Sequence, residues 1–133
     1  MEKVVITGMG CVTSLGNSPE ELWSGLLAGK SGISEIVRFN TEKFSVKFAG
    51  EVKEFDASPY FADRDAKRTC RSIQYGVHSA MQAIKNAELD DSSLDVKRAG
   101  VIFGTGMGGM EVFEDSTTAL VLKGPRRISP FFI

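Results

Sequence analysis

The order of the predicted elements indicates an α/β fold, in which helices pack on a mixed, mainly parallel sheet. Two short apolar runs, Val4–Thr7 and Ala99–Phe103, have the composition of buried strands, and each leads into a glycine-rich turn. Stretches with apolar residues at helical spacing lie between and after these two runs. The resulting order of strand, helix, long helix, strand and helix is typical of a layered α/β protein.

The first helix has clear signals at both ends. Ser18 has the right side chain for an N-cap, and Pro19 follows at the first helical position. Gly29 is a suitable C-terminal stop. We expect residues 30–60 to be irregular, with one pair of strands around residues 46–52. A single longer helix should then run from about Arg64 to Ala87, with its buried side formed by Ile73, Val77, Ala80, Met81 and Ile84.

Composition places the chain among ordinary globular proteins. Of its 133 residues, 25% are charged and 42% are hydrophobic, and the 16 basic and 17 acidic side chains leave a net charge of −1. No overall positive field would attract nucleic acid. No apolar run is long enough for a membrane span, and the N-terminus lacks the layout of a signal peptide. Two cysteines make no disulfide framework, so we expect a cytoplasmic protein.

A glycine-rich turn is the strongest functional signal. Gly104, Gly106, Gly108 and Gly109 follow a predicted strand and precede a helix that should end at Gly124–Pro125. The pattern matches a dinucleotide-binding fingerprint, but no acidic residue stands about 20 positions further on, where ribose recognition needs one. A plain turn is the second interpretation. We favour a third, in which a ligand or another chain passes close to the backbone and Met107 projects from the turn.

Basic residues gather at two places. Arg64, Lys67, Arg68 and Arg71 have the spacing of one face of the predicted long helix. Cations near a helix N-terminus are unfavourable, and Asp63 and Asp65 neutralise them only in part. The stripe is therefore either a solvated face or a docking surface for an acidic partner. A second basic cluster consists of Lys123, Arg126 and Arg127.

No catalytic constellation is visible in these 133 residues. Cys11 lacks a nearby base, and a structural role is the simpler interpretation for Cys70. His78 is the only histidine, and it lies on the polar side of the predicted long helix. One histidine and two unrelated cysteines make neither a metal site nor a nucleophile–base pair. We therefore assign no catalytic residue and no metal ligand.

Seven short motifs, in this order, resemble the N-terminal third of β-ketoacyl-acyl carrier protein synthases. The similarity is greatest to the type II elongating enzymes of the thiolase superfamily. Any one motif is weak, but the ordered set is specific. It consists of Val4-Val5-Ile6-Thr7-Gly8-Met9-Gly10, Ser31-Gly32-Ile33, Arg38-Phe39, Ile73-Gln74-Tyr75-Gly76, Ala99-Gly100-Val101, Gly104-Thr105-Gly106-Met107-Gly108-Gly109 and Arg127-Ile128-Ser129-Pro130-Phe131-Phe132-Ile133.

The resemblance implies a thiolase-like layered fold of two similar halves, of which residues 1–133 form the N-terminal portion. It also implies a homodimer that needs no cofactor. An acyl group would move from acyl carrier protein to a cysteine, and malonyl-carrier protein would lose CO₂ and attack that thioester. In this family the catalytic cysteine and both histidines lie beyond position 133, so we expect this catalytic remainder to be absent and the chain alone to be inactive.

The same resemblance gives roles to supporting residues. Met107 matches the apolar gate of the acyl pocket, and Phe132 matches an aromatic residue that crosses the dimer interface. Arg64, Lys67 and Arg68, and a second pair Arg126 and Arg127, match the positions that dock acyl carrier protein. Two alternatives remain: a non-catalytic subunit similar to a chain-length factor, and the less favoured dinucleotide-binding domain.

Overall fold

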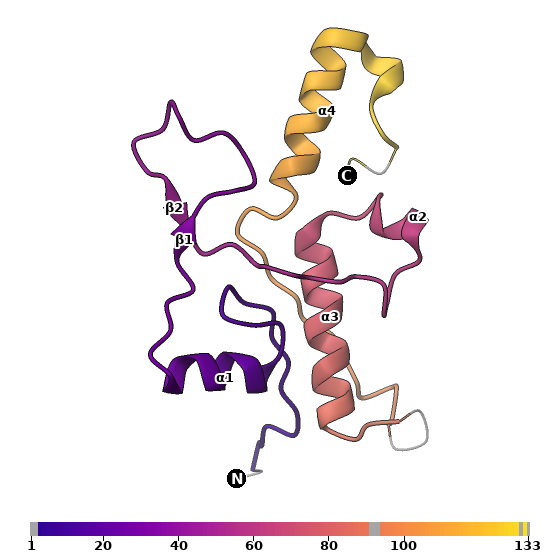
Figure 1. Ribbon diagram of the computed structural model, residues 1–133. Helices are drawn as coiled ribbons and strands as arrows, with labels where there is room; N and C mark the ends of the chain where they lie inside the picture. The colour runs from indigo at the N-terminus through magenta and orange to yellow at the C-terminus, as the bar shows by residue number, and fades with distance from the viewer. Residues whose placement is uncertain (1–2, 91–93, 131, 133) are drawn as a thin grey trace. The chain divides into compact units, whose positions relative to one another are not determined.

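The computed structural model describes residues 3–90, 94–130 and 132. The chain forms two units: Met1–Asp56 together with His78–Leu94, and Ala57–Val77 together with Asp95–Ile133. Helix α3 contributes residues to both units. Figure 1 shows the elements in chain order: α1 (Pro19–Leu27), β1 (Ser34–Glu35), β2 (Phe48–Ala49), α2 (Asp63–Ala66), α3 (Arg71–Asn86), α4 (Met110–Lys123) and a 3₁₀ turn, η1 (Pro125–Arg127).

Helix α1 of the first unit begins and ends where the sequence predicts. The backbone N–H of Glu21 donates to Ser18 Oγ at 3.2 Å, and the Glu21 carboxylate accepts from the N–H of Asn17 at 2.6 Å. These two reciprocal bonds satisfy N–H groups that have no partner inside the helix. Pro19 occupies the first turn, and Gly29 follows the helix with a φ of +63°. Both predicted signals are confirmed.

The sheet is smaller than the sequence predicts. In the described residues it consists of β1 and β2, which pair antiparallel with Ser34 opposite Ala49 and Glu35 opposite Phe48. Strand β2 falls within the predicted pair around residues 46–52. The predicted strands Val4–Thr7 and Ala99–Phe103 form no ladder in this part of the chain. Their composition still suits strands, but a strand needs a partner for its backbone hydrogen bonds.

The N-terminal segment of the first unit lies against the second half of α3. The N–H of Met9 donates to Asn86 Oδ1, and the N–H of Cys11 donates to Gln82 Oε1, each at 3.0 Å. A Cβ atom on Gly10 would stand only 2.0 Å from the carbonyl oxygen of Ser79. The chain can therefore approach the helix this closely only because residue 10 has no side chain.

The prediction of one long helix from Arg64 to Ala87 is wrong: the chain forms α2 and α3 with a break between them. Side chains supply the hydrogen bonds that a continuous helix would have made. Thr69 Oγ1 donates to the carbonyl of Asp65 at 2.7 Å. Gln74 Nε2 donates to the carbonyls of Ala66 and Thr69 at 2.7 and 2.8 Å. These side-chain bonds compete with the helical ones and stabilise the break.

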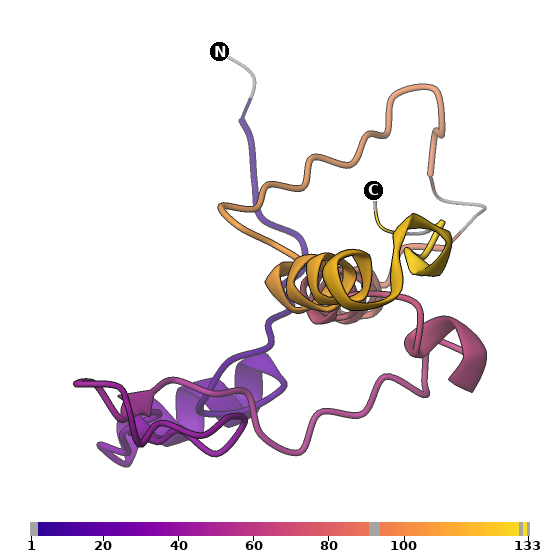
Figure 2. The same cartoon turned by 90° about the horizontal axis from the view of Figure 1, so that it is seen from above.

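Helix α4 agrees closely with its prediction. It is preceded by an extended stretch, drawn in orange in Figure 2, and followed by Gly124 with a φ of +82°. The chain then turns through η1, and Phe132 packs on Phe113 of α4 with ring centroids 6.1 Å apart. In the extended stretch, the ring of Phe103 lies over Gly76 of α3, where a Cβ atom would come within 2.3 Å of it.

Apolar side chains remain largely uncovered. Within the described residues, no hydrophobic side chain is buried. Exposure is greatest along the two predicted strands, where Val4 is 96% exposed and Ile102 is 101% exposed. Contiguous apolar surface of this kind is typical of interaction sites and ligand-binding grooves. No helix in the described ranges is both long enough and apolar enough to cross a membrane.

Candidate functional site

The glycine-rich turn of the second unit is packed on one side and open on the other. A Cβ atom on Gly108 would lie 2.8 Å from Ser72 Oγ and from Thr105 Oγ1. Gly109 has a φ of +80°, and a Cβ atom added there would lie 3.7 Å from Cys70 Sγ. Contact with the start of α3, and the left-handed conformation at residue 109, therefore explain two of the glycines. The sequence predicts that a ligand or another chain approaches this backbone closely. In the structure, the segment of the same chain at the start of α3 approaches it.

A carboxylate joins this turn to α3. The N–H of Arg71, the first residue of α3, donates to Glu111 Oε1 at 2.9 Å. Glu111 lies in the first turn of α4, directly after the glycines. A negative charge at a helix N-terminus interacts favourably with the helix dipole and with its unpaired N–H groups. Beside it, Cys70 Sγ and Ser72 Oγ are 3.1 Å apart.

The basic residues keep their exposure but lose the predicted arrangement. The break at residues 67–70 means that the first cluster does not form one continuous helical face, so the predicted stripe is wrong in that respect. Arg64 lies on α2, Arg71 begins α3, and the others lie between them. The second cluster lies at the end of α4 and on η1. Figures 1 and 2 show α2 and η1 on the same side of the start of α3. All these residues are exposed: Arg64, Lys67, Arg68, Arg71, Lys123, Arg126 and Arg127.

The two residues expected at an acyl pocket have different surroundings. Met107 is 74% exposed and projects from the turn between Gly106 and Gly108. Phe132 is half-buried against Phe113, and its N–H donates to the carbonyl of Ser129 at 3.1 Å. Both belong to the second unit.

Two thiols and one imidazole are the nucleophile and base candidates of the chain. Cys11 and Cys70 are free thiols that belong to different units. Burial raises the pKa of the Cys11 thiol, and the carboxylates of Glu20 and Glu21 raise it further. His78 packs edge-on against Phe55 with ring centroids 5.2 Å apart. Among the residues that the structure describes, no three His, Cys, Asp or Glu side chains gather as metal ligands would.

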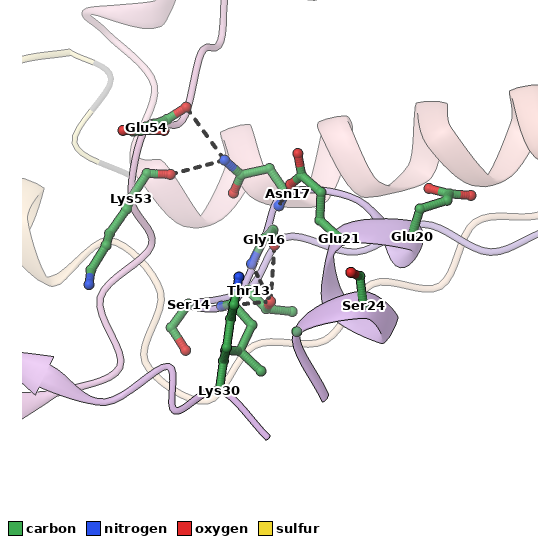
Figure 3. A pocket seen from close by; sticks show the side chains of 12 residues that line it. Thr13, Ser14, Gly16, Asn17, Glu20, Glu21, Ser24, Lys30, Lys53 and Glu54 are labelled. Atoms are coloured by element: carbon green, nitrogen blue, oxygen red, sulfur yellow. Dashed lines mark hydrogen bonds between the residues drawn. The ribbon is translucent and has the colours of Figure 1, made fainter. Parts of the chain in front are cut away.

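The first unit contains a pocket of about 660 Å³ beside the N-terminus of α1 (Figure 3). Its lining carries charges of both signs, including Lys30, Lys53 and Glu20. Asn17 closes one side, because its Nδ2 atom donates to the carbonyl of Lys53 at 2.9 Å and to that of Glu54 at 3.4 Å. Neither cysteine nor histidine lines the pocket, so it offers no nucleophile–base pair of the kind that acyl transfer needs.

Solved structures with this fold define the class of protein. The chain superposes with a TM-score of 0.83 on the ishigamide ketosynthase/chain length factor, with 31% sequence identity over 96% of this chain and 32% of that one. A ketosynthase structure in complex with its type II PKS acyl-carrier protein gives a TM-score of 0.75, with 26% identity over 98% of this chain and 34% of that one. The fold is that of ketosynthases.

Sequence comparison then gives the family. Residues 1–133 match the family model for the Beta-ketoacyl synthase, N-terminal domain, so the chain belongs to the β-ketoacyl synthase family. It is 44% identical to 3-oxoacyl-[acyl-carrier-protein] synthase 2 of Vibrio cholerae over 98% of this chain. Enzymes of the same name from Synechocystis and Staphylococcus aureus are 42% and 43% identical over 99% of it. The chain spans about a third, 32%, of the length of each of these relatives.

Sequence reasoning missed the residues that hold the turn in place. Glu111 has the signal of an acidic residue in the first turn of its own helix, α4, yet its carboxylate serves the N-terminus of α3. The contact joins residues 40 positions apart, which no local pattern indicates. Ser72 and Cys70 carried no signal beyond their place on the predicted long helix.

Proposed function

We propose that the complete protein is a 3-oxoacyl-acyl carrier protein synthase of type II fatty-acid biosynthesis. An acyl group passes from its carrier to a cysteine thiolate. Malonyl-carrier protein then loses CO₂, and the resulting carbanion attacks the thioester carbonyl and expels the thiolate. The product is a 3-oxoacyl chain two carbons longer. The observation that carries this proposal is the match of the whole chain to the family model, together with relatives of that printed name.

The reacting groups, in this proposal, lie outside these 133 residues. Condensation needs a thiolate, and a nucleophilic cysteine has a lowered pKa. Cys11 has the opposite environment, because burial and two nearby carboxylates raise its pKa. Neither Cys70 nor the only histidine of the chain, His78, matches the catalytic residues of the family. We therefore expect residues 1–133 alone to be inactive, and we assign no cofactor to the reaction.

The basic residues form the docking surface for acyl carrier protein in this proposal. Arg64, Lys67 and Arg68 are exposed around α2, and Arg126 and Arg127 are exposed on η1. Complementary charge would speed the encounter and fix the orientation of an acidic carrier. A structural relative was solved as a ketosynthase in complex with its acyl-carrier protein, which supports a partner of this kind.

Met107 and Phe132 serve the acyl pocket in this proposal: Met107 as its gate, and Phe132 as the residue that closes the pocket of the partner subunit in a homodimer. The exposed segments Val4–Thr7 and Ala99–Phe103 would join the mainly parallel layered sheet of the complete thiolase-like fold. Their uncovered apolar side chains support this placement. We infer a cytoplasmic enzyme.

A condensation assay tests the proposal. The complete protein is incubated with acyl-carrier protein and malonyl-carrier protein, and mass spectrometry follows the 3-oxoacyl product. We expect the product with the complete protein and none with residues 1–133 alone. Light scattering of the complete protein tests the homodimer. Failure of the complete protein to form product with any acyl-chain length would contradict the assignment.

The second candidate is a non-catalytic subunit similar to a chain-length factor. It is favoured by one observation: the solved relative with a TM-score of 0.83 is a ketosynthase/chain length factor. Such a subunit would produce no 3-oxoacyl product alone but would change product length when mixed with an active synthase. A dinucleotide-binding role is the least supported, since Ser72 and Cys70 occupy the packed side of the glycine turn. Saturable NAD binding to the complete protein would revive it.

A further inference from the structure

The part of the glycine turn that carries Met107 has few anchors. Gly104 and Gly106, before Met107, have no atom of the described residues within 4 Å of an added Cβ position. A Cβ atom added to Gly108, after Met107, would lie 2.8 Å from Ser72 Oγ. The segment is therefore open on one side and held only on the side that leads into α4. The contacts on that side decide where Met107 can lie.

Glu111 supplies a hydrogen bond on this side of the turn. Its carboxylate accepts the N–H of Arg71, and the first turn of α3 contains no acidic residue of its own. A hydrogen bond to an ionised acceptor is stronger than one between neutral groups. Glu111 is only two residues from Gly109, the last glycine of the turn. The carbonyl of Gly109 accepts the N–H of Phe113 in α4 at 3.0 Å. The helical bond thus ties the turn to the helix that carries the carboxylate.

We infer that Glu111 is a positioning residue that holds Met107 in place and so sets the acyl-chain length that the enzyme accepts. The inference rests on the proposed function, in which Met107 borders the acyl pocket. Glu111 acts through the turn, since its carboxylate is engaged with the N–H of Arg71. Without the carboxylate, Met107 would sample more positions, and the pocket would distinguish less sharply between chain lengths.

The test uses the complete enzyme and a series of acyl-carrier proteins that differ only in acyl-chain length. Glu111→Ala removes the acceptor, whereas Glu111→Gln keeps an acceptor oxygen without the charge. The matched control is Glu114→Ala, which removes an exposed carboxylate from the same helix. We expect Glu111→Ala to reduce the ratio of kcat/KM between the best and poorest chain lengths by about two- to fivefold. This range is the free energy that one carboxylate contributes at a helix N-terminus, converted to a ratio of rate constants. Glu111→Gln should retain most of the ratio, and Glu114→Ala all of it.

Each outcome decides the inference. An equal fall in kcat/KM for every chain length would mean that Glu111 only stabilises the fold, and an unchanged profile would mean that it does not hold Met107; either result overturns the inference. Met107→Phe separates this failure from that of the proposed function. If Met107→Phe changes the profile and Glu111→Ala does not, only the inference fails. If Met107→Phe has no effect, the acyl-pocket role and the inference fail together.

Discussion

Substitution of Gly76 by alanine tests how the extended segment before α4 packs on α3. In the interior of a helix, alanine is usually more stable than glycine by about 1 kcal/mol. At Gly76, however, the added Cβ would stand 2.3 Å from Cζ of Phe103, 2.7 Å from Cε2 and 2.9 Å from Cε1. Comfortable carbon–carbon contacts are about 3.5–4.0 Å, so the ring must withdraw by about 1 Å or more.

The cost of that withdrawal lies between two limits. Phe103 is 64% exposed, so about a third of its side chain is covered. If the ring swings away freely, the protein loses about a third of the free energy that burial of a whole phenylalanine side chain contributes, or roughly 0.5–1 kcal/mol. If the segment is held by neighbours in the complete fold, overpacking costs about 1–3 kcal/mol. After the helix gain of about 1 kcal/mol is subtracted, the effect of Gly76→Ala should lie between a stabilisation of about 0.5 kcal/mol and a destabilisation of about 2 kcal/mol.

Gly25 is the matched control, because it is also a buried glycine inside a helix. A Cβ atom there would meet Leu15 at 3.5 Å, an ordinary contact. Gly25→Ala should therefore stabilise the protein by about 0.5–1 kcal/mol. The change in the urea midpoint of the complete protein, at constant m, measures both variants. Equal stabilisation by Gly76→Ala would refute the packing argument. When Phe103 is also replaced by alanine, the added Cβ no longer meets the ring, so Gly76→Ala should stabilise the protein by about 1 kcal/mol.

Three further predictions concern the proposed site and one thiol. Charge reversal at Lys67 and Arg68 should raise KM for the acyl carrier by about tenfold at low salt and by less as salt rises; steady-state kinetics with the carrier would show no change if they do not dock it. Met107→Phe should shorten the longest acyl chain accepted, because the added volume fills the pocket; an unaltered product profile would remove Met107 from that role. The Cys11 thiol has a raised pKa, so its contribution to stability is present below the ordinary thiol pKa and is lost as the pH rises through the folded pKa. Its alkylation rate should accordingly rise at a higher pH than in the unfolded chain, and Glu20→Gln should lower that midpoint, whereas an unmoved midpoint would contradict the electrostatic cause.

Helix ends were predictable because their signals are local. Ser18 caps α1 through its own hydroxyl. Pro19 follows at the first helical position, where a backbone N–H would have no partner inside the helix and its absence costs nothing. Gly124 ends α4 with a positive φ, which glycine adopts without strain. Each of these features depends on residues within one or two helical turns. The sequence therefore placed α1 and α4 almost to the residue.

The break between α2 and α3 was not predictable in the same way. Apolar spacing continues across residues 67–70, so periodicity favours one long helix. The competing interaction is hydrogen bonding of the Thr69 and Gln74 side chains to backbone carbonyls at the end of α2 and in the break that follows it. The strands Val4–Thr7 and Ala99–Phe103 failed for another reason. A strand is a property of a pair, and the described residues offer these two segments no partner.

The candidate site shows the same division between local and long-range causes. Exposed arginines and a glycine-rich turn are visible in the sequence, because charge and φ preference belong to single residues. Their relative placement depends on the bond between Arg71 and Glu111, which spans 40 positions. Together with the packing of Gly108 and Gly109 near Ser72 and Cys70, that contact holds the turn bearing Met107 beside the start of α3, within a few residues of the basic cluster around α2. A carrier docked on that cluster would therefore bind next to the element that, in the proposed function, limits the length of its acyl chain.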